Sequence, residues 1–107
     1  MARFKLETET TPGKLVVRLS GDFDLLAFDE VDGVLSAAQE SKDLDVIVDL
    51  RSLEFIDSTG IRALMRAHAR AAGGGRLRLI RGPETIQRVF ELVGLESKLS
   101  FVETGDP

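Results

Sequence analysis

The chain has 107 residues, of which 43% are hydrophobic and 30% charged, a composition typical of one globular domain rather than a disordered chain. A formal net charge of −4 argues against a general nucleic-acid binder, and the lack of cysteine rules out disulfides and thiolate metal sites. No apolar run approaches the roughly 20 residues of a membrane span and no signal peptide is visible, so we expect a single cytoplasmic domain over residues 1–107 without membrane insertion.

Two strands are predicted at the start of the chain. Residues 3–7 alternate apolar and polar side chains, which is the pattern of a half-buried strand. Pro12 and Gly13 suit the central positions of a type II turn, and a second strand is predicted over residues 15–19. The sequence Ser-Gly-Asp-Phe-Asp is expected to end this second strand, so the chain opens with a hairpin.

Helices and strands alternate in the rest of the chain. Apolar residues at helical spacing predict helices over residues 28–38, 61–72 and 86–93. Strands are predicted over residues 44–50, 77–80 and 99–102, followed by a frayed tail at 104–107. The order strand, strand, helix, strand, helix, strand, helix, strand predicts an α/β fold with a mainly parallel sheet of about five strands and an antiparallel edge strand.

The stretch FIDSTG, residues 55–60, joins the third strand to the second helix. Asp57 or Ser58 suits the N-cap of that helix, which is worth about 1 kcal/mol, and Gly60 suits a close approach to a neighbouring element. Because one cap needs one such side chain, Asp57, Ser58 and Thr59 together supply more polar groups than capping uses.

Further acids are expected close to this junction. Asp22 and Asp24 follow the predicted second strand. If that strand and the third are parallel neighbours, both loops emerge at the carboxyl end of the sheet, where open α/β sheets place their functional sites. Asp22, Asp24 and Asp57 would then surround Ser58.

The helix after Ser58 carries a basic ridge. Arg62, Arg66 and Arg70 repeat every four residues. Such a ridge is often only a solvated helix face. Beside an acidic rim, however, it makes a surface of two signs that suits a specific protein partner.

Serine hydrolase chemistry is disfavoured at Ser58. A nucleophile elbow needs glycine two residues before the serine, and Ile56 stands there instead. The single histidine, His68, lies further along the same helix, roughly 15 Å away at 1.5 Å per residue, and is expected to be a packed core residue.

Phosphate and magnesium sites are disfavoured as well. Residues 73–75 are three glycines, but they follow a helix, whereas a phosphate cradle precedes one. An aspartyl phosphoacceptor with magnesium, as in response-regulator receivers, would need an acid at a strand tip, and Asp49 lies inside its strand. The sequence Arg81-Gly82-Pro83 also stands where a receiver has lysine.

Three stretches of the chain follow a known pattern. One motif is Leu-x-x-Leu-x-Phe-x-Asp-Ser-x-Gly, filled by Leu50, Leu53, Phe55, Asp57, Ser58 and Gly60. A second is a Gly-acid-apolar-Asp loop, filled by Gly21, Asp22, Phe23 and Asp24. The third is the stretch IQRVFELVGLESKLSF, residues 86–101, which matches a last helix and strand. In all three, and so over nearly its whole length, the chain resembles the STAS domain of bacterial anti-sigma factor antagonists.

The resemblance implies a phosphorylation switch at Ser58. In that family the unphosphorylated antagonist binds an anti-sigma factor that is also a GHKL-type serine kinase, and so frees the sigma factor; a serine phosphatase reverses the modification. ATP and magnesium belong to the kinase, so this chain is expected to be no enzyme and to hold no cofactor or metal. The expected partner-binding residues are Asp22, Phe23, Asp24, Asp57, Ser58, Thr59, Gly60, Arg62 and Arg66.

Several points stay open at the level of sequence. Phe23 is larger than the family's usual aliphatic residue, and Leu25-Leu26 follows where small polar residues are common. Thr59 offers a second hydroxyl, so the choice of Ser58 rests on motif position. Two other functions remain: a STAS subunit of a membrane-lipid transporter complex, and a non-phosphorylated scaffold of a signalling assembly.

Overall fold

The structure is a computed structural model that describes residues 2–103. Its elements, in chain order, are β1 (Lys5–Thr11), β2 (Lys14–Phe23), the short 3-10 helix η1 (Leu25–Ala27), α1 (Phe28–Ala38), β3 (Asp45–Ile56), α2 (Ser58–Ala71), β4 (Arg76–Ile80), α3 (Glu84–Leu92) and β5 (Phe101–Val102). The predicted order of strands and helices is confirmed. Residues 104–107, predicted as a frayed tail, lie outside the described residues.

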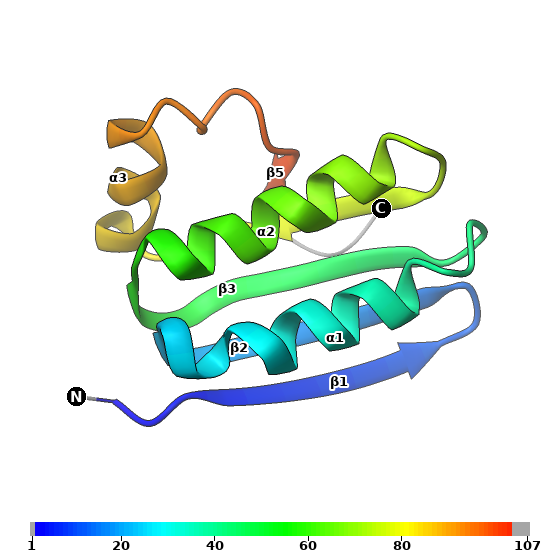
Figure 1. The fold of residues 1–107 in the computed structure, drawn as a ribbon, viewed down its shortest axis with the longest axis horizontal. Coiled ribbons are helices and arrows are strands. Elements are labelled where there is room, and N and C mark those ends of the chain that lie inside the picture. Colours follow the sequence, from blue (N-terminus) through cyan, green and yellow to red (C-terminus); the bar gives the residue numbers. More distant parts are fainter. Residues whose placement is uncertain (1, 104–107) are drawn as a thin grey trace.

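The five strands form one sheet in the order β1-β2-β3-β4-β5 (Figure 1). β1 pairs antiparallel with β2, and every later pair is parallel. The hairpin between β1 and β2 turns at Gly13, whose φ of 76° lies in the left-handed region that glycine adopts without strain. The predicted sheet, mainly parallel with an antiparallel edge strand, is therefore confirmed.

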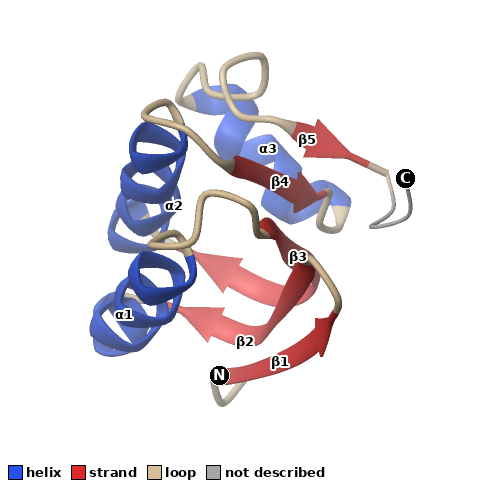
Figure 2. Cartoon of the chain, turned by 90° about the vertical axis from the view of Figure 1, so that its right-hand side faces the viewer, coloured by secondary structure: helices blue, strands red, loops and turns tan. Residues whose placement is uncertain are grey.

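Helices α1 and α2 lie side by side on one face of the sheet (Figure 2). Their apolar stripes meet alternate residues of the strands, so that Leu35 of α1 and Leu64 of α2 join Val48 of β3 in one buried core. Helix α3 lies beside the end of β3 that extends beyond β4 (Figure 1), and Phe90 belongs to the same core. The carboxyl ends of β2 and β3 are thereby held against packed helices.

Strands β2 and β3 are longer than predicted. The expectation that Ser-Gly-Asp-Phe-Asp ends the second strand is wrong, because β2 continues to Phe23 and β3 continues to Ile56. The two strands pair from Lys14 opposite Asp45 to Phe23 opposite Ile56, with irregular register on either side of Ser20 and Gly21. Pairing between the strands supplies backbone hydrogen bonds that local sequence preference cannot indicate. β5, in contrast, is shorter than the predicted 99–102.

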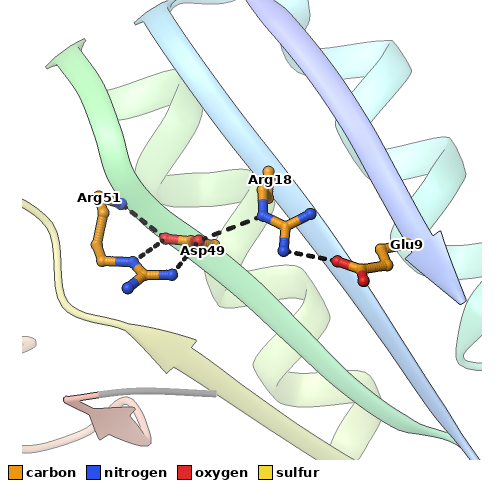
Figure 3. A network of polar contacts seen from close by, with 4 residues as sticks. All are labelled: Glu9, Arg18, Asp49 and Arg51. Carbon is orange, nitrogen blue, oxygen red and sulfur yellow. Dashed lines mark hydrogen bonds and ion pairs between the residues drawn. The ribbon is translucent and has the colours of Figure 1, made fainter. Parts of the chain in front are cut away.

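A charged network lies on the sheet face turned away from α1 and α2 (Figure 3). Asp49 is buried; its Oδ2 lies 2.9 Å from an Arg51 nitrogen and 3.8 Å from Arg18, which in turn contacts Glu9 at 2.7 Å. Burial alone would raise the pKa of Asp49, but hydrogen bonds and charge from Arg51, together with Arg18, outweigh it and leave the pKa below its usual value. Asp49 is thus engaged in ion pairs inside its strand, which strengthens the argument against an aspartyl phosphoacceptor.

Candidate functional site

The ends of β2 and β3 bring two motif loops together. Phe23 and Ile56 are the last paired residues of the two strands, and the Asp57 N–H donates a hydrogen bond of 3.3 Å to the Phe23 carbonyl. Because the strands are parallel, both chains leave the sheet at its carboxyl edge. The condition on which the acid cluster was predicted, that these strands are parallel neighbours, is therefore met.

Asp57 is the N-cap of α2. Its Oδ1 accepts hydrogen bonds from the backbone N–H groups of Thr59, at 2.9 Å, and Gly60, at 3.1 Å. These bonds satisfy two of the N–H groups that a helix leaves unpaired at its start. Ser58, the first residue of α2, is exposed, whereas Thr59 is only partly exposed. The cap therefore leaves the Ser58 side chain on the surface and free of the capping role.

Gly60 holds the start of α2 against the strand ends. It is buried, and a Cβ at this position would lie 2.7 Å from Ile56 Cγ1 and 3.0 Å from Phe23 Cγ. Separations below about 3 Å force the neighbouring atoms apart, so no larger residue fits without movement. The predicted close approach at Gly60 is confirmed, and it gives the exposed Ser58 a rigid support.

The loop after β2 places its predicted site residues at different depths. Asp22 is 9% exposed and Phe23 is fully buried, with its ring 5.5 Å from that of Phe4. Asp24 Oδ1 accepts a hydrogen bond from the Leu26 N–H at 3.1 Å and so caps η1. The structure thus places Phe23 beneath the surface around Ser58, where its side chain supports that surface without being displayed on it.

Exposed apolar side chains are found where β2 and β3 end, which the sequence did not indicate. Leu25 is 69% exposed, Leu26 is 92% exposed, and Phe55, near the end of β3, is 48% exposed. Leu26 also borders a hollow of about 380 Å³ that Asp22 and Glu30 help to line. In the sequence, Leu25 and Leu26 are distinguished only as departures from the family pattern. Their signal in the sequence was two adjacent leucines ahead of the first helical stripe.

The basic ridge of α2 is divided between two environments. The guanidinium carbon of Arg62 lies 5.6 Å from the centre of the Phe28 ring, and within residues 2–103 no carboxylate pairs with Arg62. Arg66 and Arg70 both contact Asp32 of α1, at 3.1 and 3.3 Å. Arg62 alone therefore presents an unpaired charge close to Ser58, while Arg66 is occupied by a contact between helices.

Asp32 is the acid that holds the other two arginines. Burial would raise its pKa, but hydrogen bonds from Arg66 and Arg70, with their charges, leave the pKa of Asp32 below its usual value. Arg70 also donates a hydrogen bond of 2.9 Å to Gln39 Oε1, and Gln39 Nε2 donates one of 2.8 Å to the Ala67 carbonyl. This network fixes α1 against α2 rather than offering charges to a partner.

Residues 2–103 contain neither a metal-binding cluster nor a membrane-spanning helix. No group of three or more His, Asp or Glu side chains there is arranged to hold a metal ion. Within the same residues, no helix has the length and apolar character needed to cross a membrane.

Known proteins are similar to this chain over most of its length. A family model described as "Mlab, STAS domain" matches residues 6–103. A curated relative, the anti-sigma-B factor antagonist of Staphylococcus aureus, is 26% identical over 92 residues, which cover 85% of each chain.

Solved structures share the fold. An anti-sigma factor antagonist from Mycobacterium paratuberculosis superposes with a TM-score of 0.85 at 20% identity, covering 97% of this chain and 89% of that one. The Bacillus cell fate determinant SpoIIAA in its phosphorylated form superposes with a TM-score of 0.69 at 26% identity, covering 94% of this chain and 91% of that one.

Proposed function

This chain belongs to the STAS domain family, and from that premise we propose that it is an anti-sigma factor antagonist switched by phosphorylation of Ser58. In the unphosphorylated state it binds an anti-sigma factor that is also a GHKL-type serine kinase, and so releases the sigma factor. A serine phosphatase restores that state. The similarity to an anti-sigma-B factor antagonist and to SpoIIAA in a phosphorylated form supports this proposal.

The observation that carries the proposal is the exposed Ser58 beside a cap made by another residue. Asp57 satisfies the N–H groups at the start of α2, and Gly60 fixes that start against Ile56 and Phe23. A kinase can therefore reach the Ser58 hydroxyl without breaking the cap. Thr59 is less exposed and lies inside the capped turn, which favours Ser58 as the modified residue.

In the proposed reaction this chain is the substrate. Ser58 Oγ forms a bond to the γ-phosphorus of ATP as the bond to ADP breaks, and the hydroxyl proton passes to a base of the kinase. ATP and magnesium are bound by the kinase, so this chain needs no cofactor of its own.

The effect of the phosphate follows from its charge and its place. It adds about −1.5 to −2 charges at neutral pH next to Asp57, at the sheet edge where Asp24 also follows β2. The helix N-terminus offsets part of that repulsion, by about 0.3–1 kcal/mol. A partner that covers the neutral Ser58 hydroxyl together with exposed apolar side chains at the ends of β2 and β3, such as Leu25 and Phe55, would meet a hydrated dianion in that contact. Phosphorylation is therefore expected to weaken docking while leaving the fold intact.

The direct test compares Ser58 variants for binding to the cognate anti-sigma kinase. We expect Ser58→Ala to bind like the unphosphorylated protein and Ser58→Asp to bind at least about tenfold more weakly, a change of about 1.4 kcal/mol. Incubation with ATP and the kinase, followed by mass spectrometry, should add one phosphate to the wild type and to Thr59→Val but none to Ser58→Ala. Equal affinity of the alanine and aspartate variants would exclude the switch.

A second candidate function is a STAS subunit of a membrane-lipid transporter complex. The matching family model, whose description names Mlab, supports keeping this candidate. It uses the same exposed edge around Ser58 for docking but requires no phosphate transfer. Co-purification of the tagged chain with a transporter ATPase, and absence of phosphate after incubation with serine kinases encoded nearby, would favour it over the antagonist role.

A further inference from the structure

The outer edge of β4 is only half covered by β5. Strand β5 pairs with Leu79 and Ile80 only. On that outer side of β4, no strand in the described part of the chain pairs with Arg76, Leu77 or Arg78. The Leu79 N–H donates to the Ser100 carbonyl at 2.9 Å, and the Arg81 N–H donates to the Val102 carbonyl at 3.0 Å. The N–H groups of Leu79 and of Arg81, the residue just after β4, therefore point toward this edge.

The same alternation brings the N–H and C=O of Leu77 to the open part of that edge. In a parallel pairing, both groups of one residue face one neighbour and those of the next residue face the other. No described residue from 2 to 103 supplies a partner for the Leu77 groups on the outer side. Leu77 is 8% exposed as a whole residue, and an edge N–H and C=O that lack a partner within the described fold can take one from an added strand.

A hollow of about 460 Å³ lies directly beside Leu77. Its apolar lining includes Ala71, Ala72 and Val102, and its polar lining includes His68 and Arg76. The predicted core histidine, His68, is thus partly exposed and borders this hollow. An edge with unpaired backbone groups and an adjacent apolar hollow has the features by which sheets accept an added peptide strand.

Positive charge marks the same corner of an acidic protein. Arg76 is exposed and forms no ion pair within the described residues, and Lys42 lies alongside, with its Cδ 3.5 Å from a Cβ built on Gly74. Arg78 is held by Asp45 at 2.6 Å, so its charge is already compensated. Two copies of this edge would place Arg76 and Lys42 of each chain against those of the other, which disfavours a second copy as the occupant.

We propose that the outer edge of β4 at Arg76–Arg78 binds an extended acidic peptide segment of a protein partner, added to the sheet as a short strand in line with β5. The Leu77 N–H and C=O pair with the segment's backbone, an apolar side chain of the segment enters the hollow, and its carboxylates face Arg76. Helix α2, 14 residues and roughly 20 Å long, separates this edge from Ser58, so both surfaces are available at once.

One experiment needs no ligand. Hydrogen exchange in the free full-length chain should show the Leu77 amide exchanging faster than those of Val46 and Val48, which face β4 inside the sheet. A Leu77 amide protected as strongly as Val48 would show that the edge is already covered and would overturn the proposal.

A second experiment uses a capped nine-residue peptide of alternating glutamate and valine, titrated to millimolar concentration into the isotope-labelled chain. We expect amide shifts centred on Arg76–Arg78 and slowed exchange at Leu77. The same peptide with lysine for glutamate, or with a central proline that removes a backbone donor, should bind about tenfold more weakly or not at all.

Variants locate the contact. Arg76→Glu should weaken the glutamate peptide about tenfold, Arg76→Lys should retain most of the affinity, and Arg62→Glu, at the far end of α2, should leave it unchanged. No shift at Leu77 up to millimolar peptide, equal binding of the lysine peptide, or dimerisation of the free chain through this edge would each overturn the proposal. None of these outcomes bears on phosphorylation of Ser58.

Discussion

The two halves of α2 carry arginines at the same spacing but use them differently. Arg62, one turn from Ser58, lies over the ring of Phe28, whereas Arg66 and Arg70 contact Asp32. The helices run in the same direction along the sheet (Figure 1), so α1 presents an aromatic ring to the first arginine and a carboxylate to the next two. The residue of α1 that faces each arginine, rather than the spacing of the arginines along α2, therefore decides which arginine remains unpaired.

This difference separates the half of α2 that carries the proposed site from the half that packs against α1. The first half has an exposed serine, an unpaired guanidinium and neighbouring exposed apolar side chains. In the second half, the arginine charges are neutralised by ion pairs with Asp32 of α1. Changes in the first half should therefore alter binding, and changes in the second half should alter stability. Gly60 is an exception, because it lies in the first half but its replacement should alter stability through packing.

The largest effect is expected from Gly60→Ala, which lies in the displaying half but acts on stability. The added methyl would meet Ile56 and Phe23, and we expect the free energy of unfolding to fall by about 1–3 kcal/mol in urea denaturation. The matched control is Gly33→Ala in α1, where a Cβ meets open space and should stabilise the helix by about 0.5–1 kcal/mol. Equal effects of both changes would show that α2 does not start in close contact with the strands.

An intermediate effect is expected from Asp32→Asn, which removes the acid shared by Arg66 and Arg70. At neutral pH the free energy of unfolding should fall by about 1 kcal/mol. The folded pKa of Asp32 is lowered, so its contribution is present above the ordinary aspartate pKa of about 4 and is lost as the pH falls through the folded value. Wild-type and variant stabilities should therefore converge at acid pH.

The control for that measurement is Asp43→Asn. Asp43 is exposed, lies outside the helices and forms no ion pair within residues 2–103. Its replacement should leave stability within about 0.5 kcal/mol of the wild type at every pH. If the difference in the free energy of unfolding between the wild type and Asp32→Asn stayed constant down to pH 2, the ion pairs of Asp32 could not be its cause.

The smallest effect on stability, below about 0.5 kcal/mol, is expected from Arg62→Gln. Its effect should appear when Ser58 carries a phosphate, because residues i and i+4 lie on one face of a helix. The second pKa of phosphoserine, about 6 when unperturbed, should be lower with Arg62 present than with glutamine, as measured by phosphorus NMR. Arg70→Gln should leave this pKa unchanged and lower stability more. If Arg70→Gln changed the phosphoserine pKa and Arg62→Gln did not, the two halves of α2 would not differ in the way described.

Sequence alone determined the local features of this protein. Helical and alternating periodicity placed the five strands and three α-helices of residues 2–103 in the right order but missed the short η1, and that order predicted the directions of the strands. The motif around Ser58 predicted a site at the junction between β3 and α2. These features depend on neighbouring residues in the chain, which periodicity and capping rules describe directly.

Only the tertiary structure decided what depends on contacts between distant elements. β2 and β3 extend to Phe23 and Ile56 because they pair with one another there, although the local sequence favours a break after Leu19. Phe23 lies in the core because Gly60 and Phe4 come to pack against it. The same is true of the arginines: spacing put three charges on one helix, but only the position of α1 determined which of them is left for a partner.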